Sequence, residues 1–288
     1  MTLAGAPQPF GWAPDRHLRV EVSGGDCRSV IIRQSWSAQG HEAEVYLYRS
    51  VLAFVHVRTP TLLGVFQLEH SEPGWMVLED LGTEVLQPSS RQDREAVLYA
   101  LGVLHGATTE SQPTARLLAP LPRFGAAEID AGYPAVLAVA DPSSGVPDWM
   151  APFAGAILKN MLEATCSLVH GDVEFSNMLA TADGVALIDW EKATYGPASV
   201  DLGPLMEYVD DERELENYVR GWGLTSELSF PVAREWARLG RAYDCIRWVC
   251  HYLRARSNGA DPGPGWRAQY YDPRIEWLRQ HRDEAGQS

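Results

Sequence analysis

Short apolar runs rich in β-branched residues dominate the chain before residue 82 and predict β-structure there. Residues 18–22 (LRVEV) and 29–33 (SVIIR) have the composition of strands. The Ser23–Asp26 segment between them contains two glycines, which supply the positive φ angles that a tight hairpin needs. These residues therefore predict a β-hairpin.

A helix and two further strands follow the hairpin. Residues 41–55 (HEAEVYLYRSVLAFV) are rich in apolar residues and carry their acidic residues near the start, as expected of a helix that packs on a sheet. Residues 62–68 and 75–78 predict strands, separated by the turn-like segment 69–74. The first 82 residues thus predict a small sheet that carries one helix.

Beyond Gly82 the spacing of apolar residues becomes mainly helical. Ser90 and Asp93 resemble a capping box, and apolar residues then recur at helical spacing at Ala96, Val97, Ala100, Leu101 and Leu104. Residues 113–147 are rich in proline and predict loops with short helical pieces.

The rest of the chain predicts helices around a single hairpin. A helix is expected over 150–164, a strand at 168–169 and, after an irregular loop, a hairpin of 178–181 with 185–188. Further amphipathic helices are expected at 204–220, 231–256 and 272–283.

The change of pattern near residue 82 favours two lobes. With 288 residues, of which 45% are hydrophobic, the chain is long enough to bury a sizeable core. The elements predict an α+β protein with a small N-terminal β lobe carrying one helix (residues 1–82) and a larger, mainly helical C-terminal lobe (residues 83–288).

Composition narrows the classes of partner and location. No apolar run approaches the roughly 20 residues that span a bilayer, and the first residues lack the features of a signal peptide, which predicts a cytoplasmic protein without a membrane partner. The formal charge of −14 disfavours nucleic acid as a partner and would accommodate a cationic substrate, although many soluble proteins are equally acidic. The four cysteines form no CxxC pair, which favours buried free thiols over a metal site or disulfides.

Three polar residues carry the candidate chemistry. Phosphoryl transfer needs a carboxylate that accepts a hydrogen bond from the attacking hydroxyl, and oxygen ligands that hold Mg²⁺ against the phosphate. Asp172 opens a loop after a strand, Asn177 closes it, and Asp189 is expected at the end of the second strand of the next hairpin. Each alone has an ordinary explanation as a turn or loop residue. Together they indicate a magnesium and phosphate site.

The segments that contain these residues carry a resemblance. Residues 170–177 (HGDVEFSN) and 187–203 (LIDWEKATYGPASVDLG) resemble the catalytic segment of the aminoglycoside phosphotransferase and choline kinase group. That group has the patterns His-Gly-Asp, four residues, Asn, then Ile-Asp-Trp-Glu and Asp-Leu-Gly or Asp-Leu-Ala. The resemblance implies a two-lobed protein-kinase-like fold and a small-molecule kinase.

The same resemblance implies residue roles. Asp172 would be the catalytic base, and Asn177 and Asp189 would be the magnesium ligands. Asp201 would anchor the helix that follows it, and His170 would support the geometry of the loop.

The likeness continues outside this core. Residues 101–108 (LGVLHGAT) resemble a helix end of the family, and residues 75–82 (WMVLEDLG) resemble its last N-lobe strand and interlobe hinge. By that alignment Leu78 borders the adenine, and the main chain at Glu79 and Leu81 hydrogen-bonds its edge.

One departure concerns the residue that holds the phosphates. Kinases of this fold use a lysine on the third strand, paired with a glutamate on the adjacent helix. The matching strand here offers Arg33, with Glu44 as its candidate partner and Glu42 as the alternative. Arginine is not equivalent to the compact ammonium of lysine, and an exposed edge-strand arginine is the alternative interpretation.

A second departure concerns the loop that covers the phosphates. Pro7, Pro9 and Pro14 make residues 1–15 a poor strand, because proline lacks the donor that a ladder needs. Either the Ser23–Asp26 segment is a shortened phosphate loop, or it is an ordinary hairpin and the usual first strand and loop are absent.

The sequence contains weaker evidence about the acceptor molecule. An acidic cluster could bind a cationic acceptor but is also typical of a solvated helix face; it consists of Glu207, Asp210, Asp211, Glu212, Glu214 and Glu216. Five aromatic residues could form a wall for a cation, although their helical spacing favours core packing: Trp222, Trp236, Tyr243, Trp248 and Tyr252.

The sequence therefore predicts a Mg²⁺-dependent kinase that transfers the γ-phosphate of ATP or GTP to a hydroxyl of a small acceptor, such as an aminoglycoside or amino alcohol. The alternative is a catalytically silent kinase-like module with a degenerate nucleotide site. A metal-dependent hydrolase using Asp172 and Asp189 is disfavoured, because a two-metal site needs further ligands. Protein kinase activity is disfavoured by the lack of an activation segment ending in Ala-Pro-Glu.

Overall fold

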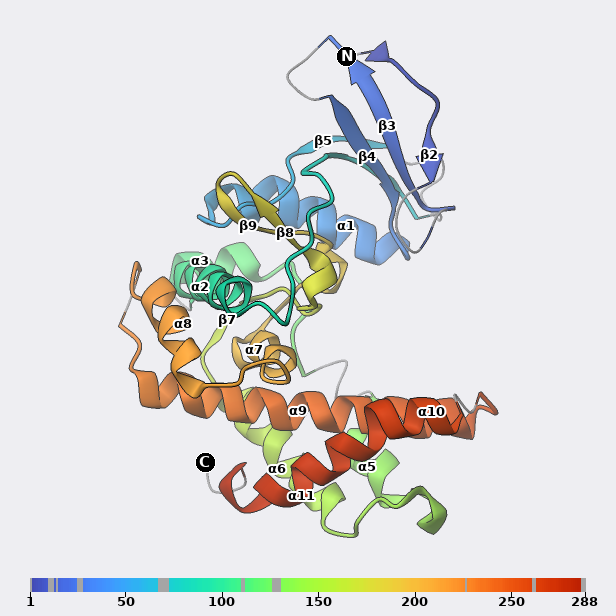
Figure 1. The fold of residues 1–288 in the computed structure, drawn as a ribbon, viewed down its shortest axis with the longest axis vertical. Coiled ribbons are helices and arrows are strands. Elements are labelled where there is room, and N and C mark those ends of the chain that lie inside the picture. Colours follow the sequence, from blue (N-terminus) through green and yellow to red (C-terminus); the bar gives the residue numbers. More distant parts are fainter. Residues whose placement is uncertain are drawn as a thin grey trace.

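An antiparallel sheet occupies the N-terminal part of the computed structural model, which describes residues 2–9, 13, 15–24, 28–66, 73–109, 112–125, 131–225, 227–260 and 263–285. Along the main path the strand order is β1-β3-β4-β6-β5, and β2 also pairs with β3 (Figure 1). The strands are β1 (Thr2–Leu3), β2 (Gln8–Pro9), β3 (His17–Ser23), β4 (Ser29–Gln34), β5 (Leu62–Phe66) and β6 (Trp75–Glu79). The predicted 18–22/29–33 hairpin and the two later strands are confirmed, whereas residues 67–68 of the first of these strands and residues 69–72 of the expected turn lie outside the described residues.

The N-terminal segment forms strands despite its prolines. β1 and β2 are two residues each and pair along the outer edge of β3, where Pro9 lies opposite Leu18. An edge position tolerates a proline, because only one side of the strand has to donate to the sheet. The connection from β2 to β3 therefore enters the sheet at His17, which pairs with Arg33.

The β3–β4 turn lies at the opposite end of the sheet from Arg33. Glu21 pairs with Ser29 next to the turn, and the neighbouring Val30 pairs with Glu79 of β6. The turn itself falls partly outside the described residues. The described residues on either side of the turn thus lie away from Arg33, which argues against a phosphate-covering role for the Ser23–Asp26 segment.

One helical segment packs on this sheet. α1 (Ala38–Tyr46) continues into a π-helical turn (Leu47–Val51) and a 3-10 turn (Leu52–Phe54), which confirms the helix expected over 41–55. Its apolar side chains join those of β6 in one buried cluster that includes Leu47, Val51 and Met76.

The C-terminal part is mainly helical and is built around the long helix α9 (Phe230–Ser257). Figure 1 shows α2, α7 and α8 on one side of α9 and α5, α6 and α11 on the other. The helices are α2 (Arg91–Thr108), α3 (Gln112–Leu118), α5 (Tyr133–Ala138), α6 (Met150–Glu163), α7 (Ser199–Leu205), α8 (Leu215–Trp222), α10 (Pro264–Trp266) and α11 (Asp272–Ala285). Two small antiparallel pairs complete it: β7 (Cys166–Val169) with β10 (Thr194–Pro197), and β8 (Met178–Thr181) with β9 (Gly184–Leu187).

Most of the expected helices are confirmed, but the one over 204–220 is wrong. α7 begins at Ser199 and ends at Leu205, and α8 begins only at Leu215. Between them the Asp211 side chain accepts a hydrogen bond from the Arg213 amide at 3.0 Å and starts a separate 3-10 turn. Local capping thus interrupts the apolar periodicity that had suggested one helix.

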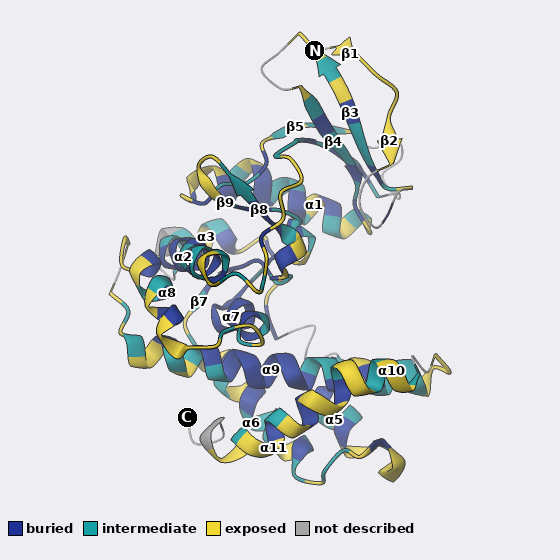
Figure 2. Ribbon diagram, in the orientation of Figure 1, coloured by how far each residue is buried: buried dark blue, intermediate teal, exposed yellow. Residues whose placement is uncertain are grey.

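Close packing of α7 against α9 fixes the part of the chain that supports the site. A Cβ built on Gly240 of α9 would lie 1.9 Å from the Ser199 carbonyl oxygen, so only glycine permits this approach. α7 is buried along nearly its whole length (Figure 2).

The described cysteines and helices bear on two further expectations, those about free thiols and membrane spans. Cys166, Cys245 and Cys250 are free thiols, the last two buried, and Cys27 lies outside the described residues. Among the helices that the structure describes, none has the length and apolarity needed to cross a membrane.

Candidate functional site

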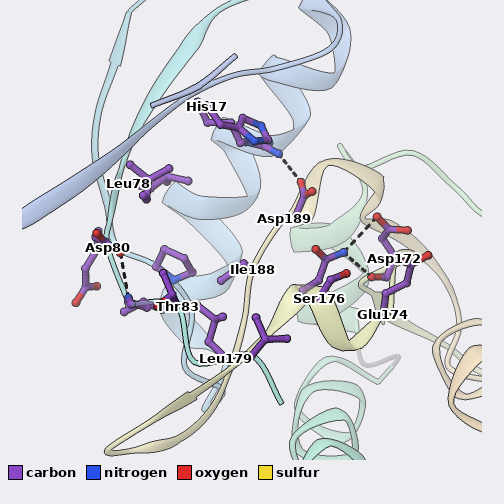
Figure 3. A pocket seen from close by; sticks show the side chains of 18 of the residues that line it. His17, Leu78, Asp80, Thr83, Asp172, Glu174, Ser176, Leu179, Ile188 and Asp189 are labelled. Carbon is purple, nitrogen blue, oxygen red and sulfur yellow. Dashed lines mark hydrogen bonds and ion pairs between the residues drawn. The ribbon is translucent and has the colours of Figure 1, made fainter. Parts of the chain in front are cut away.

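A cavity of about 640 Å³ lies between the sheet and the segments that follow β7 and β9. Its lining includes all but one of the residues predicted to act as the base, hold magnesium or contact the nucleotide, namely Arg33, Leu78, Glu79, Leu81, Asp172, Asn177 and Asp189. Figure 3 shows Leu78 on the sheet side, with Asp189 and Asp172 on the other side of the space. The remaining residue, Glu44, is buried behind Arg33.

The loop that carries Asp172 is anchored by Asp201. The buried Asp201 carboxylate accepts hydrogen bonds from the amides of His170 (2.7 Å) and Gly171 (2.8 Å) and lies 3.0 Å from Nε2 of His105. The expectation that Asp201 anchors the following helix therefore needs correction. It lies in the first turn of α7 and fixes the preceding loop, because its side chain points at the backbone of residues 170 and 171.

His170 links this loop to the segment before Asp189. Its Nε2 lies 2.8 Å from the Ile188 carbonyl oxygen, and its Nδ1 accepts a hydrogen bond from the Asp172 amide at 3.3 Å. The imidazole thereby holds the two acidic residues at a fixed separation.

Asp172 and Asn177 are joined within the loop. The Asn177 side-chain nitrogen donates to the Asp172 carbonyl oxygen at 3.0 Å and to its carboxylate at 3.3 Å. Lys192 contacts the same carboxylate, with Nζ 2.8 Å from Oδ1. The carboxylate is thus oriented from two sides.

Asp189 has an unusual backbone conformation. Its φ is 64°, which makes it the only non-glycine residue with a positive φ among those the structure describes. It follows β9 by two residues, so it does not end the strand as expected from the sequence. A non-glycine residue in this region is held there by its surroundings, and such positions cluster at functional sites.

Arg33 is the hub of the ionic contacts in the cavity. β4 lies between β3 and β6, and Arg33 is only 5% exposed, so the interpretation as an exposed edge-strand arginine is wrong. Its guanidinium hydrogen-bonds the carboxylates of Glu44 and Asp189, and Glu191 lies 3.6 Å away. The alternative partner, Glu42, is exposed.

Glu44, which binds the Arg33 guanidinium, is harder to ionise than an ordinary glutamate. Burial, together with the charges of Asp189 and Glu191, raises the pKa of Glu44 to about 7, although the positive charge of Arg33 lowers it. Oε1 of Glu44 is buried without a hydrogen-bond partner among the described residues. The cluster therefore holds more negative charge than Arg33 alone compensates, as expected of a place that receives a further cation.

The segment after β6 is braced by Asp80, which was not singled out from the sequence. Its carboxylate accepts hydrogen bonds from Ser29 Oγ (2.7 Å), the Gly82 amide (3.0 Å) and Arg19 (2.9 Å). Although burial opposes the effect, the hydrogen bonds from Ser29 and Arg19 lower the pKa of Asp80. This network fixes the backbone that runs past Leu81.

Two other site residues were also missed. Glu191 accepts a hydrogen bond from the Trp36 amide at 2.7 Å, which links the end of β4 to the Asp189 segment. Lys192 approaches Asp172 as described above. Both lie within three residues after Asp189 in the motif quoted from the sequence, and that proximity was the available signal.

A second cavity of about 360 Å³ adjoins the first. The described residues that line both cavities are Asp172, Glu174 and Lys192. Its other walls come from α9 and α10 and consist of Arg247, Trp248, His251, Tyr252, Ala255 and Trp266. Of the five aromatic residues noted in the sequence, Trp248 and Tyr252 line this cavity, and Tyr252 is also part of a core cluster. Trp222 and Tyr243 belong to the core clusters, and Trp236 packs against one of them.

The acidic cluster serves structural ion pairs. Glu214 is buried and binds Arg94 through both carboxylate oxygens at 2.9 Å. Glu207 lies 2.8 Å from Arg274, and Glu212 lies 3.1 Å from Arg238. None of the cluster residues lines either cavity described above.

The residues expected to hold magnesium fit that ion. Mg²⁺ in phosphate sites takes one or two protein oxygen ligands and completes its shell with phosphate and water. Asp189 supplies a carboxylate, and the Asn177 amide nitrogen faces Asp172, which leaves its oxygen as the remaining acceptor. Within the described part of the chain no group of three or more His, Cys, Asp or Glu side chains could hold a metal ion.

Solved structures with the same architecture define the class of fold. The GDP complex of wild-type aminoglycoside 2'-phosphotransferase-IIIa aligns with a TM-score of 0.67 at 13% identity, covering 98% of this chain and 94% of that chain. Choline kinase LicA from Streptococcus pneumoniae aligns with a TM-score of 0.64 at 14% identity, covering 97% and 95%. The fold is the two-lobed protein-kinase-like fold of these proteins.

The sequence matches a family within that class. The model of the phosphotransferase enzyme family APH matches residues 11–239, and the chain belongs to this family. Thiamine kinase of Salmonella paratyphi B (strain ATCC BAA-1250 / SPB7) is 26% identical over 208 residues, which are 67% of this chain and 65% of that protein. The thiamine kinase of Salmonella gallinarum (strain 287/91 / NCTC 13346) is 28% identical over the same shares. The alignment thus spans just under two thirds of the length of these relatives.

Proposed function

We propose that this protein is a Mg²⁺-dependent kinase that transfers the γ-phosphate of ATP or GTP to a hydroxyl group of a small molecule. The observation that carries the proposal is the position of Asp172 on the boundary between two cavities. The larger cavity has the volume for a nucleotide, and the smaller one has the volume for an acceptor. Phosphoryl transfer requires both molecules to meet at one carboxylate.

The nucleotide occupies the larger cavity in this proposal. Leu78 borders the base, and the main chain at Glu79 and Leu81 hydrogen-bonds its edge. Arg33, held by Glu44, binds the phosphates. Residues 1–82 then form the nucleotide-binding lobe, and residues 83–288 supply the catalytic groups and the acceptor site.

Asp172 acts as the base. The acceptor oxygen forms a bond to the γ-phosphorus while the bond from that phosphorus to the bridging oxygen breaks. The nucleoside diphosphate leaves with the electron pair of that bond. The hydroxyl proton passes to the Asp172 carboxylate. Asn177 and Lys192 keep this carboxylate in place.

Lys192 is the only cation among the described residues that line both cavities. Its backbone is packed against the loop, because a Cβ on Gly171 would lie 2.3 Å from the Lys192 carbonyl oxygen. Its side chain is 62% exposed and can turn from Asp172 to the phosphoryl group in transit. There it neutralises the charge that gathers on the transferring oxygens.

Asn177 and Asp189 hold the magnesium ion. When bound, Mg²⁺ neutralises charge on the phosphate oxygens and favours their approach to the acceptor. Arg33 already binds Asp189 across the cavity, so the residues of the sheet and of the catalytic segment meet at the place where the phosphates belong.

A coupled phosphate-transfer screen tests the proposal. The panel contains thiamine, kanamycin, choline, hydroxy amino acids and sugars, with ATP and with GTP, and the Asp172→Ala protein is the control. Thermal stability with Mg·ATP is measured alongside, since a ligand at about 100 times its Kd stabilises by about 2.7 kcal/mol. Transfer that survives in Asp172→Ala removes Asp172 as the base. A stabilising shift without any transfer supports the silent kinase-like module, and no shift at millimolar nucleotide rejects nucleotide binding altogether.

A further inference from the structure

The outer wall of the second cavity has a distinctive composition. The residues that line this cavity alone include three aromatic rings, those of Trp248, Tyr252 and Trp266. The charged group among them is Arg247, and no carboxylate belongs to this wall within the described part of the chain. Asp172 and Glu174 lie on the side shared with the nucleotide cavity.

The rings are arranged as flat surfaces. Tyr252 and Trp266 stack with centroids 5.3 Å apart and planes 6° apart. Trp248 stacks on Tyr270 at 6.1 Å and 21°. Trp248 and Trp266 are half-buried, so part of each ring remains accessible. Such surfaces favour a flat ring as the bound molecule, because stacked aromatic rings attract beyond the area that they bury.

Arg247 brings an incompletely compensated positive charge to this wall. It hydrogen-bonds Asp244 at 3.1 Å, but the same carboxylate also binds Arg241 at 3.2 Å. Arg241 in turn shares Glu207 with Arg274. In this network three guanidinium groups share two carboxylates.

Among the described residues that line this cavity alone, no other group offsets that charge. Partial burial and the charge of Arg247 lower the pKa of His251, so the imidazole is neutral near pH 7. Three residues of the acidic cluster noted in the sequence, Glu207, Glu212 and Glu214, are held by arginines elsewhere. A cationic acceptor would find rings here but also a repelling guanidinium. An anionic substituent would find a donor with a planar pair of N–H groups.

We infer that the acceptor is a flat aromatic or heteroaromatic alcohol that carries an anionic group, bound by stacking on the Trp248 and Trp266 rings and by Arg247. Its hydroxyl group reaches Asp172. This inference rests on the proposed kinase function and refines it, since it replaces the cationic acceptor expected from the sequence.

Three matched probes test the charge preference: 4-(hydroxymethyl)benzoate, 4-(hydroxymethyl)benzamide and 4-(hydroxymethyl)benzylamine. They share a ring and a primary alcohol and differ in the charge of one substituent. The wild-type protein is expected to phosphorylate the benzoate with the highest kcat/KM and the benzylamine with the lowest. Arg247→Gln should lower kcat/KM for the benzoate by about 10- to 100-fold, because a charge-assisted hydrogen bond is lost. The kcat/KM for the benzamide should remain nearly unchanged.

Two observations control for a general effect of the Arg247→Gln substitution on the fold. Arg247→Gln leaves Asp244 bound to Arg241, so the fold is retained. Arg234→Gln removes an arginine from the same helix outside the cavity. Trp248→Leu should weaken all three probes by a similar factor of about two to ten.

The outcomes distinguish a failure of the acceptor preference from a failure of the kinase function. A wild-type preference for the benzylamine, or an unchanged benzoate-to-benzamide ratio in Arg247→Gln, overturns the inference. Transfer to aminoglycosides or amino alcohols but to none of the ring probes also overturns it and leaves the kinase proposal standing. If the wild type neither binds Mg·ATP nor phosphorylates any acceptor in the screen, the proposed function itself fails.

Discussion

At the scale of single residues, the charge balance on the boundary between the two cavities depends on Lys192. We expect Lys192→Met to lower kcat by about 100-fold, because removing one donor to transition-state charge typically costs that much. The KM values for nucleotide and acceptor should change little. Lys192→Arg should restore part of the rate. Lys159→Met, which removes the exposed lysine of α6, serves as the matched control in steady-state kinetics.

A pH profile distinguishes contact with the phosphoryl group from a role in orienting Asp172. If Lys192 only favoured the ionised form of Asp172, the rate of Lys192→Met would recover at higher pH. Contact with the phosphoryl group instead predicts a loss that stays constant above the acid limb of the profile. Full recovery would reduce Lys192 to a positioning residue.

The buried Glu44 makes a prediction about stability. Its folded-state pKa of about 7 lies above its ordinary value of 4.5, so ionisation is harder in the folded protein. This group therefore stabilises the fold fully below about pH 4.5, and that contribution is lost as the pH rises through 7. The free energy of unfolding of wild type relative to Glu44→Gln should fall by up to about 3 kcal/mol across this window. Urea denaturation at pH 5 and 7.5 measures it, and parallel pH curves for the two proteins would contradict the assignment.

At the scale of elements, the approach of α7 to α9 predicts the effect of one methyl group. Gly240→Ala should destabilise the protein by about 1–3 kcal/mol, since its Cβ would overlap the Ser199 carbonyl oxygen. The shift of α7 should also reduce kcat, because Asp201 would no longer hold the amides of the Asp172 loop. Gly155→Ala in α6 meets no atom within 4 Å and should stabilise by about 0.5–1 kcal/mol. Equal melting temperatures for the two variants would refute this account.

Elements were predictable wherever local pattern and tertiary packing agree. The hairpin of residues 18–33 and the helix from Arg91 follow from periodicity and from Ser90, whose side chain accepts the Asp93 amide at 3.2 Å. The Asp93 carboxylate, however, binds the Gln87 amide, so the capping box is only half formed. β2 was not expected, because its partner β3 rather than its own sequence makes Pro9 a strand residue.

At the scale of the whole molecule, the sequence located the residues proposed for catalysis but not those proposed to bind the acceptor. Asp172, Asn177 and Asp189 lie within 18 residues of chain, so a motif could identify them. The second cavity instead combines that loop with residues from α9 and α10, more than 50 positions later. Arg247 and Trp248 have no signature of their own, and only the fold brings them near Asp172.

The two parts of the molecule meet through Arg33, which binds Glu44 on α1 and Asp189 beyond β9. If Asp189 holds Mg²⁺ together with the phosphates, as proposed, the ion replaces this guanidinium at Asp189, and nucleotide should stabilise the protein much more with Mg²⁺ than with a chelator. In wild type, Mg²⁺ should increase the affinity for ATP. We expect Asp189→Asn to reduce this increase by at least about tenfold, because the ligand loses its charge. Calorimetric titration of ATP at varied Mg²⁺ measures this. Asp183→Asn, an exposed acid in the β8–β9 turn, is the matched control. If ATP binding by Asp189→Asn depends on Mg²⁺ as strongly as in wild type, Asp189 does not bind the ion and serves only as a partner of Arg33.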